Sequence, residues 1–216
     1  MSTISRRQFL QFSAAAGGAL AFGDLADQVL GLTRWAKPAY GAEPIKIGIV
    51  DPLSSPYKTS SIHDVHGATV ALEMYNKRGG VLGRQVSIVE ADDASNVPTA
   101  IKVANKLIKE DRVDFLMGTF NGDVALAVSD VAKQENKLFM ATCPHIMELT
   151  GTRCNSHTFA FMPNARMMSE AVTPHLVKAY GNRWYMVTAD TVDGRSALQA
   201  MTDALKANGG EVVGVT

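Results

Sequence analysis

The fold is decided by the stretch IKIGIVDPLSSPYKTSS, residues 45–61, in which an apolar run leads into a loop rich in Ser and Pro. Residues 45–50 predict a β-strand. A helix is predicted over residues 62–77, because apolar side chains recur there at helical spacing. Gly79 and Gly80 end this helix. A strand followed by a helix that crosses back is the repeating unit of parallel sheets.

The same alternation of strand and helix continues along the chain. Further strands are predicted over residues 86–90, 114–117, 138–141 and 158–161, with helices from Pro98 onwards and over 123–134. A second run of the pattern is predicted as helices 165–180 and 195–207 and strands 184–189 and 212–215. Short connections of this kind imply right-handed crossovers. We therefore predict an α/β fold with a doubly wound parallel sheet, as one near-complete lobe plus the start of a second.

The N-terminus carries an export signal. Residues 5–10 read SRRQFL, a twin-arginine motif, and residues 12–22 form an apolar run behind it. Eleven residues are too few to span a bilayer as a helix, so a removable signal is favoured over an anchor. Processing is predicted near residues 39–42, with a mature protein that starts near Glu43 and works in the periplasm. The predicted domains are therefore the signal (1–42), a first lobe (43–162) and a partial second lobe (163–216).

The composition narrows the class of protein. The 216 residues include 21 Lys and Arg against 21 Asp and Glu, so the formal net charge is zero. No basic stripe with interleaved aromatic residues is present, which argues against nucleic acid as a partner. Two cysteines, Cys143 and Cys154, are the only thiols of the sequence. In an oxidising compartment they could form a disulfide, or they could remain as two free thiols, and the sequence leaves both possibilities open.

A binding site is predicted at the carboxyl ends of the strands, where ligands of open parallel sheets gather. The loops at these ends are residues 51–55, 118–123, 141–144 and 190–194. The loop after the third strand runs into a helix N-terminus, which favours an anionic group such as a carboxylate. The alternative is that the polar residues of these loops are ordinary helix caps.

Signs of catalysis are weak. His63 and His66 flank Asp64 at helical spacing, but a third metal ligand is missing from the pattern, so an exposed helix face is the preferred interpretation. The chain has no nucleophile elbow, phosphate-binding loop or dinucleotide fingerprint, and no cofactor is predicted. Cys143 has no base at a recognisable spacing.

Several segments, taken together, resemble the solute-binding proteins of ABC transporters. The family is that of type I periplasmic binding proteins, in the group that includes the leucine/isoleucine/valine-binding proteins. The segments that carry the likeness are IKIGI (45–49) with Leu53-Ser54, NKRGGVLGR (76–84), EADDA (90–94), ANKLI (104–108) and ELT (148–150). The resemblance implies two lobes, a hinge and a cleft that closes on an amino acid or similar small carboxylate. It also implies transfer of the ligand to a membrane ABC permease, without enzymatic chemistry.

The resemblance places ligand contacts in four loops. The implied ligand-binding residues are Ser54, Ser60, Asn121, Gly122, Ala141, Thr142, Cys143 and Asp193. Two of them depart from the family pattern, in which a serine usually stands at Gly122 and an aromatic residue at Asp193. Asp123 adds a further negative charge. The two acids, Asp123 and Asp193, either favour a cationic or amide-bearing ligand or are simply solvated.

Family members carry a longer mature chain that returns once more to each lobe, so we expect this sequence to be a fragment or the product of an interrupted gene. Two alternative functions are also compatible with this sequence. One is a ligand-sensing receptor domain on the same fold. The other is an exported α/β enzyme that uses Cys143 or His145.

Overall fold

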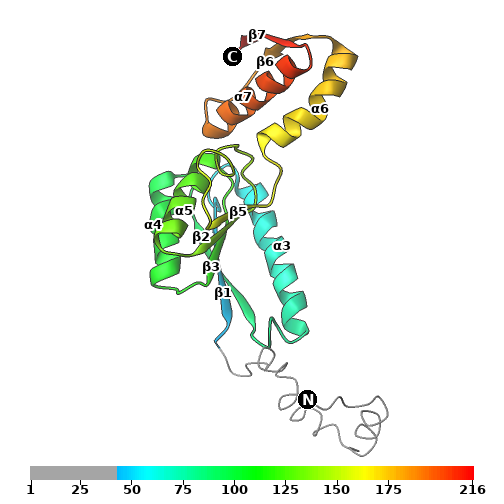
Figure 1. Ribbon diagram of the computed structural model, residues 1–216. Helices are drawn as coiled ribbons and strands as arrows, with labels where there is room; N and C mark the ends of the chain where they lie inside the picture. Colours follow the sequence, from blue (N-terminus) through cyan, green and yellow to red (C-terminus); the bar gives the residue numbers. More distant parts are fainter. Residues whose placement is uncertain (1–42) are drawn as a thin grey trace, which may run out of the picture.

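The computed structural model describes residues 43–216 (Figure 1). The predicted export signal, residues 1–42, lies outside the described residues. Two parallel sheets follow one another along the chain, one of five strands and one of two. The division predicted between residues 162 and 163 falls between these sheets. We call residues 45–160 the five-stranded unit and residues 165–215 the two-stranded unit.

The five-stranded sheet has the order β2-β1-β3-β4-β5, with every neighbouring pair parallel. Its strands are β1 (Ile45–Asp51), β2 (Val86–Asp92), β3 (Phe115–Gly118), β4 (Leu138–Ala141) and β5 (Thr158–Ala160). From β1 the chain moves outward to β2, then returns across β1 to β3 and continues the other way. The strand order therefore reverses between β1 and β3, which is the switch point at which such sheets bind ligands.

Three helices cover this sheet: α3 (Lys58–Lys77), α4 (Val97–Lys109) and α5 (Gly122–Gln134). Figure 1 shows α4 and α5 together on one face and α3 on the other, which confirms the predicted doubly wound α/β fold. The large core lies between the sheet and the α4–α5 pair. It is centred on Leu107, Leu116 and Phe139, all at most 1 % exposed.

The start of α4 shows how the local sequence sets a helix boundary. The Asn96 side chain accepts a hydrogen bond from the Thr99 N–H at 3.0 Å, and Pro98 lies in the first turn. Both features favour a helix N-terminus. Ala104, Leu107 and Ile108 face the core, as their spacing predicts, but Ala100 is buried in place of Ile101, which is exposed.

The two-stranded unit contains α6 (Ala165–Tyr180), β6 (Arg183–Met186), α7 (Val192–Ala207) and β7 (Glu211–Val215). Strands β6 and β7 are parallel, and α6 packs against α7. Figure 1 places this unit beyond the carboxyl end of the five-stranded sheet, joined by the segment that follows β5.

Two predicted helix starts were too late in the chain. Helix α3 begins at Lys58 rather than residue 62, because the N–H groups of Ser60 and Ser61 already donate to Tyr57 O. Ser60 therefore lies on the helix and not in a loop.

Helix α7 begins at Val192 rather than residue 195. The Thr191 hydroxyl caps it by accepting from the Gly194 N–H at 3.1 Å. Asp193 consequently belongs to the first turn of α7, and not to a loop in front of it. No helix among residues 43–216 combines the length and the apolar character that crossing a membrane requires.

Candidate functional site

The site begins at the switch point, where β1 ends in Asp51 and β3 ends in Gly118. The loops that leave these strands are held against their neighbours. The Thr119 N–H donates to Val50 O at 2.7 Å, and the Thr142 N–H donates to Gly118 O at 3.1 Å. The carboxyl ends of β1, β3 and β4 are thereby drawn together, as the parallel sheet predicts.

Asp51 is the most unusual residue of this edge. Its side chain is fully buried, and neither carboxylate oxygen has a hydrogen-bond partner. Burial raises the pKa of Asp51 to about 8, and the charges of Asp64 and Asp93 add to the rise. Asp93 is also buried, and its pKa is raised to about 6, again chiefly by burial. At neutral pH the Asp51 carboxyl is therefore mostly protonated.

Buried oxygen atoms without partners concentrate at this edge. Of six such side-chain atoms among the described residues, five belong to Asp51, Asp93, Thr119 and Asn121. These residues stand at or just after the ends of β1, β2 and β3. Because an unsatisfied buried polar atom costs free energy, the edge favours water or a molecule that hydrogen-bonds to these atoms.

Asp64 and Thr142 connect the two sides of the sheet at this edge. Asp64 projects from α3, and its Oδ2 accepts from the Thr142 hydroxyl at 3.5 Å. Burial raises the pKa of Asp64 as well. Thr142 follows the buried Ala141 at the end of β4, so the strand itself positions the hydroxyl.

Cys143 lacks the electrostatic surroundings of a nucleophile. Burial, followed by the charges of Asp64, Asp51 and Asp193, raises its pKa to about 11. The thiol therefore stays protonated, whereas a reactive cysteine needs a lowered pKa. This environment argues against the enzyme hypothesis.

The structure holds both cysteines as free thiols, Cys143 half-buried and Cys154 exposed. A disulfide between them in an oxidising compartment stays a prediction of the sequence.

Asp193 reaches the site from the two-stranded unit. Its Oδ2 accepts a hydrogen bond from the Gly122 N–H at 2.8 Å, at the first residue of α5. The two residues that depart from the family pattern are thus in direct contact. A neighbouring contact joins the same units, since the Ser196 hydroxyl donates to Glu148 Oε2 at 3.1 Å and accepts from the Met147 N–H at 2.9 Å.

The structure gathers most of the predicted site residues. The residues that come together at the edge are Asn121, Gly122, Ala141, Thr142, Cys143 and Asp193. Ser54 and Ser60 are exposed on the loop after β1 and on the first turn of α3. No hydrogen bond within residues 43–216 links the Ser60 side chain to the gathered residues.

Sequence reasoning placed loops 51–55 and 118–123 at this edge but assigned no role to four residues of the region. Asp51 is a buried acid and Asp64 a half-buried one, and an acid that ends an apolar strand was the available signal for Asp51. Tyr57 and Phe120 stack with their ring centroids 4.8 Å apart, joining the loops after β1 and β3. No sequence pattern predicts that stack, because the two loops are far apart in the chain.

A metal centre finds no support in the part of the chain that the structure describes. No group of three or more His, Cys, Asp or Glu side chains there is arranged to hold a metal ion. His63 and His66 are exposed or nearly so on α3, in keeping with an ordinary helix face.

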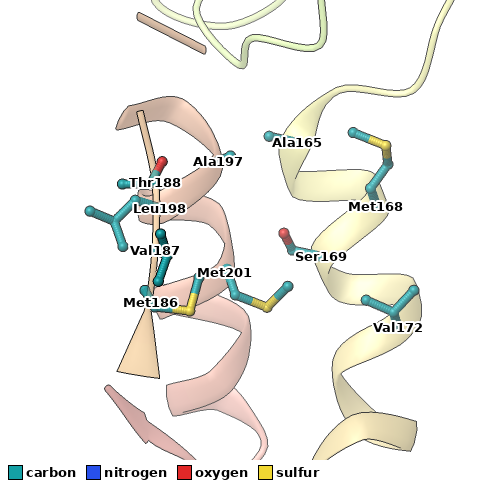
Figure 2. Close-up of a pocket in the computed structure, with 10 residues that line it drawn as sticks. All are labelled: Ala165, Met168, Ser169, Val172, Met186, Val187, Thr188, Ala197, Leu198 and Met201. Carbon is teal, nitrogen blue, oxygen red and sulfur yellow. The ribbon is translucent and has the colours of Figure 1, made fainter. Parts of the chain in front are cut away.

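A cavity of about 300 Å³ lies inside the two-stranded unit. Figure 2 shows that it opens between α6, α7 and the end of β6. Its lining is apolar except for Ser169 and Thr188, and Met168, Met186 and Met201 supply much of the wall. None of the predicted ligand-binding residues lines it.

The fold and the site define a class of protein: an α/β protein that presents buried polar groups at the switch point of a parallel sheet, next to a second α/β unit. The comparisons with known proteins identify the family. A model described as periplasmic binding protein matches residues 44–216, so the chain belongs to that family. A model of the twin-arginine translocation signal matches residues 3–23. The protein is therefore periplasmic and is exported by the twin-arginine route.

Relatives agree with this assignment. The Leu/Ile/Val-binding protein BraC3 of Rhizobium johnstonii is 37 % identical over 98 residues, which are 45 % of this chain and 26 % of the relative. A periplasmic binding protein from Burkholderia mallei has a TM-score of 0.72 at 27 % identity over 82 % of this chain and 47 % of the other. A solute-binding protein of an ABC transporter from R. palustris, in complex with benzoate, has a TM-score of 0.70 at 25 % identity, covering 80 % and 47 %. The chain thus spans less than half the length of these proteins.

Proposed function

We propose that this protein is the solute-binding component of an ABC uptake transporter. In this proposal it binds an amino acid, or a related small carboxylate or amide, between its two lobes and hands the solute to a membrane permease. No bond is made or broken in the process. Closure of the cleft follows from the contacts that the solute makes with both lobes.

One observation carries the proposal beyond family membership. The buried acceptors without partners lie at the switch point of the sheet, on Asp51, Asp93, Thr119 and Asn121. Water or a polar solute must satisfy them, because a folded chain seldom leaves so many acceptors unpaired at one place. The site also lies beside the contact between the two units, where a solute can touch both.

The names of relatives support the solute class. Several matched relatives are named Leu/Ile/Val-binding proteins, and the R. palustris protein holds benzoate. Amino acids and small aromatic acids are therefore the solutes to test first.

Thermal unfolding of the full chain tests the proposal. The melting temperature is measured with each of the amino acids, with aromatic acids and with their amides, because a solute that binds the folded state raises it by mass action. We expect at least one of these solutes to raise the melting temperature in a saturable way, and Asn121→Ala with Thr142→Ala to abolish the rise. A response that survives both substitutions would contradict the proposed site. Steady consumption of any of the solutes would contradict a binding function.

A further inference from the structure

The contact between Asp193 and Gly122 has a consequence for which solutes the site accepts. The first N–H groups of an α-helix have no partners within the helix, and the helix dipole favours a negative charge there. In α5 the Val124 N–H already donates to Oδ1 of Asp123, an acid of the first turn, at 2.9 Å. This is the place at which a solute carboxylate would be expected to bind. In the structure the Gly122 N–H already donates to a carboxylate, that of Asp193, at 2.8 Å.

Gly122 leaves space for the Asp193 carboxylate beside the start of α5. A Cβ atom at Gly122 would stand 3.0 Å from both oxygens of Asp193, and it would overlap the Ile146 side chain. Only a glycine at this position leaves room for both neighbours. Thr191 caps α7 and so directs Asp193, two residues later, toward α5.

The other buried polar groups of the edge can accept hydrogen bonds. Oxygen atoms of Asp51, Thr119 and Asn121 are buried without a hydrogen-bond partner; the Asn121 carbonyl can only accept, whereas the Thr119 hydroxyl and the protonated Asp51 carboxyl can also donate. Asp64 adds a carboxylate beside Thr142. The edge therefore has an anion bound at the start of α5 already, and it offers further acceptors to a solute N–H group.

We infer that Asp193 determines specificity: it fills the anion site at the N-terminus of α5 from within the chain, so that a solute carboxylate is excluded from that site. This inference rests on the proposed solute-binding function and narrows it. The solute is recognised instead through amine or amide N–H groups, which can satisfy the free acceptors. The same contact joins the two units, so Asp193 also positions α7 against α5.

The test uses the full chain and removes the internal carboxylate. Asp193→Ala should lower the melting temperature by roughly 5 °C, since a charge-assisted hydrogen bond is lost. Adding about 100 mM sodium formate should recover most of that loss, because formate can bind the vacated site. Formamide, which has nearly the same shape without the charge, should not. The wild-type chain should respond equally to formate and to chloride at the same ionic strength.

Asp203→Asn is the matched control, because Asp203 is an exposed acid on the same helix and contacts only Gln199. It should leave the melting temperature and the formate response as in the wild type. The inference is overturned if formate acts on Asp193→Ala no more than chloride does, or if formate stabilises the wild type as strongly as the variant.

A second measurement keeps the inference testable if Asp193→Ala does not fold. The chain has two Asn-Gly pairs, Asn121-Gly122 and Asn208-Gly209, so labelling Asn carbonyl carbon and Gly nitrogen isolates two amide signals. The Gly122 proton should shift as Asp193 titrates, because it donates to that carboxylate. The Gly209 N–H donates to Lys206 O and should not follow the same titration.

The titration also separates this inference from the proposed function, since it requires no solute. Asp123 and His145 are the other charged groups that act on Asp193, so Asp193→Asn serves to isolate its own contribution. A Gly122 signal that does not titrate in the wild type, or titrates unchanged in Asp193→Asn, would refute the contact. Failure of every amino acid to bind would instead count against the proposed function alone.

Discussion

The two units of the molecule follow the same pattern of strand and helix, yet they bury very different amounts of apolar side chain. The five-stranded unit encloses a continuous core between its sheet and the α4–α5 pair. In the two-stranded unit, Leu205 is the only buried hydrophobic side chain larger than alanine among the described residues. Tyr185 and Val187 of the same unit are 60 % and 78 % exposed.

The difference shows that an alternating pattern predicts elements but does not by itself supply a core. A strand buries both faces only when it has neighbours in the sheet and helices above and below. β1 has such neighbours in β2 and β3, whereas β6 pairs with β7 alone. The two-stranded unit depends instead on the helix pair α6–α7 and on its contacts with the five-stranded unit.

The largest expected effect tests this contrast in burial. Phe139→Ala removes a fully buried ring and should lower the free energy of unfolding by about 4 kcal/mol. Tyr185→Ala, its counterpart in the two-stranded unit, should change it by about 0.5 kcal/mol. Urea unfolding followed by circular dichroism measures both. Equal losses of stability in the two variants would show that the two units are packed alike, contrary to their difference in buried apolar side chains.

A second effect concerns the charge buried in the five-stranded unit. Asp51 has a pKa near 3.8 when unfolded and about 8 when folded, so its ionisation opposes folding. The contribution of Asp51 to stability should be greatest below pH 4 and should be lost as the pH rises to about 8. Asp51→Asn should remove this loss and stabilise the chain by a few kcal/mol at pH 8, with little difference at pH 4.

Melting curves across this pH range provide the measurement. Asp203→Asn is the control, since that exposed acid should leave the pH dependence as it is in the wild type. If Asp51→Asn follows the wild-type pH dependence, then the Asp51 carboxyl is not buried as the structure has it.

A third prediction tests how the two units are held together. Ser196→Ala leaves the Met147 N–H and Glu148 Oε2 without their shared partner, and Ser196 is only 2 % exposed. The cost should be about 2 kcal/mol, because buried groups lose their hydrogen bonds. Ser156→Ala, at an exposed hydroxyl, should cost about 0.5 kcal/mol or less. Similar values for the two variants would mean that the interface contributes nothing to stability.

The smallest expected effect compares matched helix caps. Asn96 caps α4 and Thr191 caps α7, each through its side-chain oxygen, and replacement by Ala should cost about 1 kcal/mol locally. We expect Asn96→Ala to lower the stability of the whole five-stranded unit. Thr191→Ala should mainly speed hydrogen exchange in α7, because the side chains that this helix buries are small apart from Leu205. Equal changes in exchange across both units would indicate that they unfold as one.

Much of the fold could be predicted because its signals are local. The strand at residues 138–141 and the helix at 165–180 have the predicted bounds. Apolar runs of strand length and apolar side chains at helical spacing depend only on nearby residues. The starts of α3 and α7 were missed, because Ser60 and Asp193 are residue types common in loops, and the local hydrogen bonds to Tyr57 O and to the Thr191 hydroxyl are visible only in the structure.

The candidate site, like the fold, could be predicted from the sequence only in part. Topology alone placed Asn121 and Thr142 at one edge, since the carboxyl ends of parallel strands meet there. The raised pKa of Asp51 could not be predicted, because it depends on burial in the folded chain and on the charges of Asp64 and Asp93, which the fold brings near.

By itself, the sequence determined the export signal, the order of strands and helices and the edge of the sheet at which Asn121 and Thr142 lie. Those properties follow from residue type and spacing along the chain. Only the tertiary structure decided that Gly122 and Asp193, 71 residues apart, share one hydrogen bond. Such contacts depend on how the two units pack against each other, which the periodicity of the sequence does not predict.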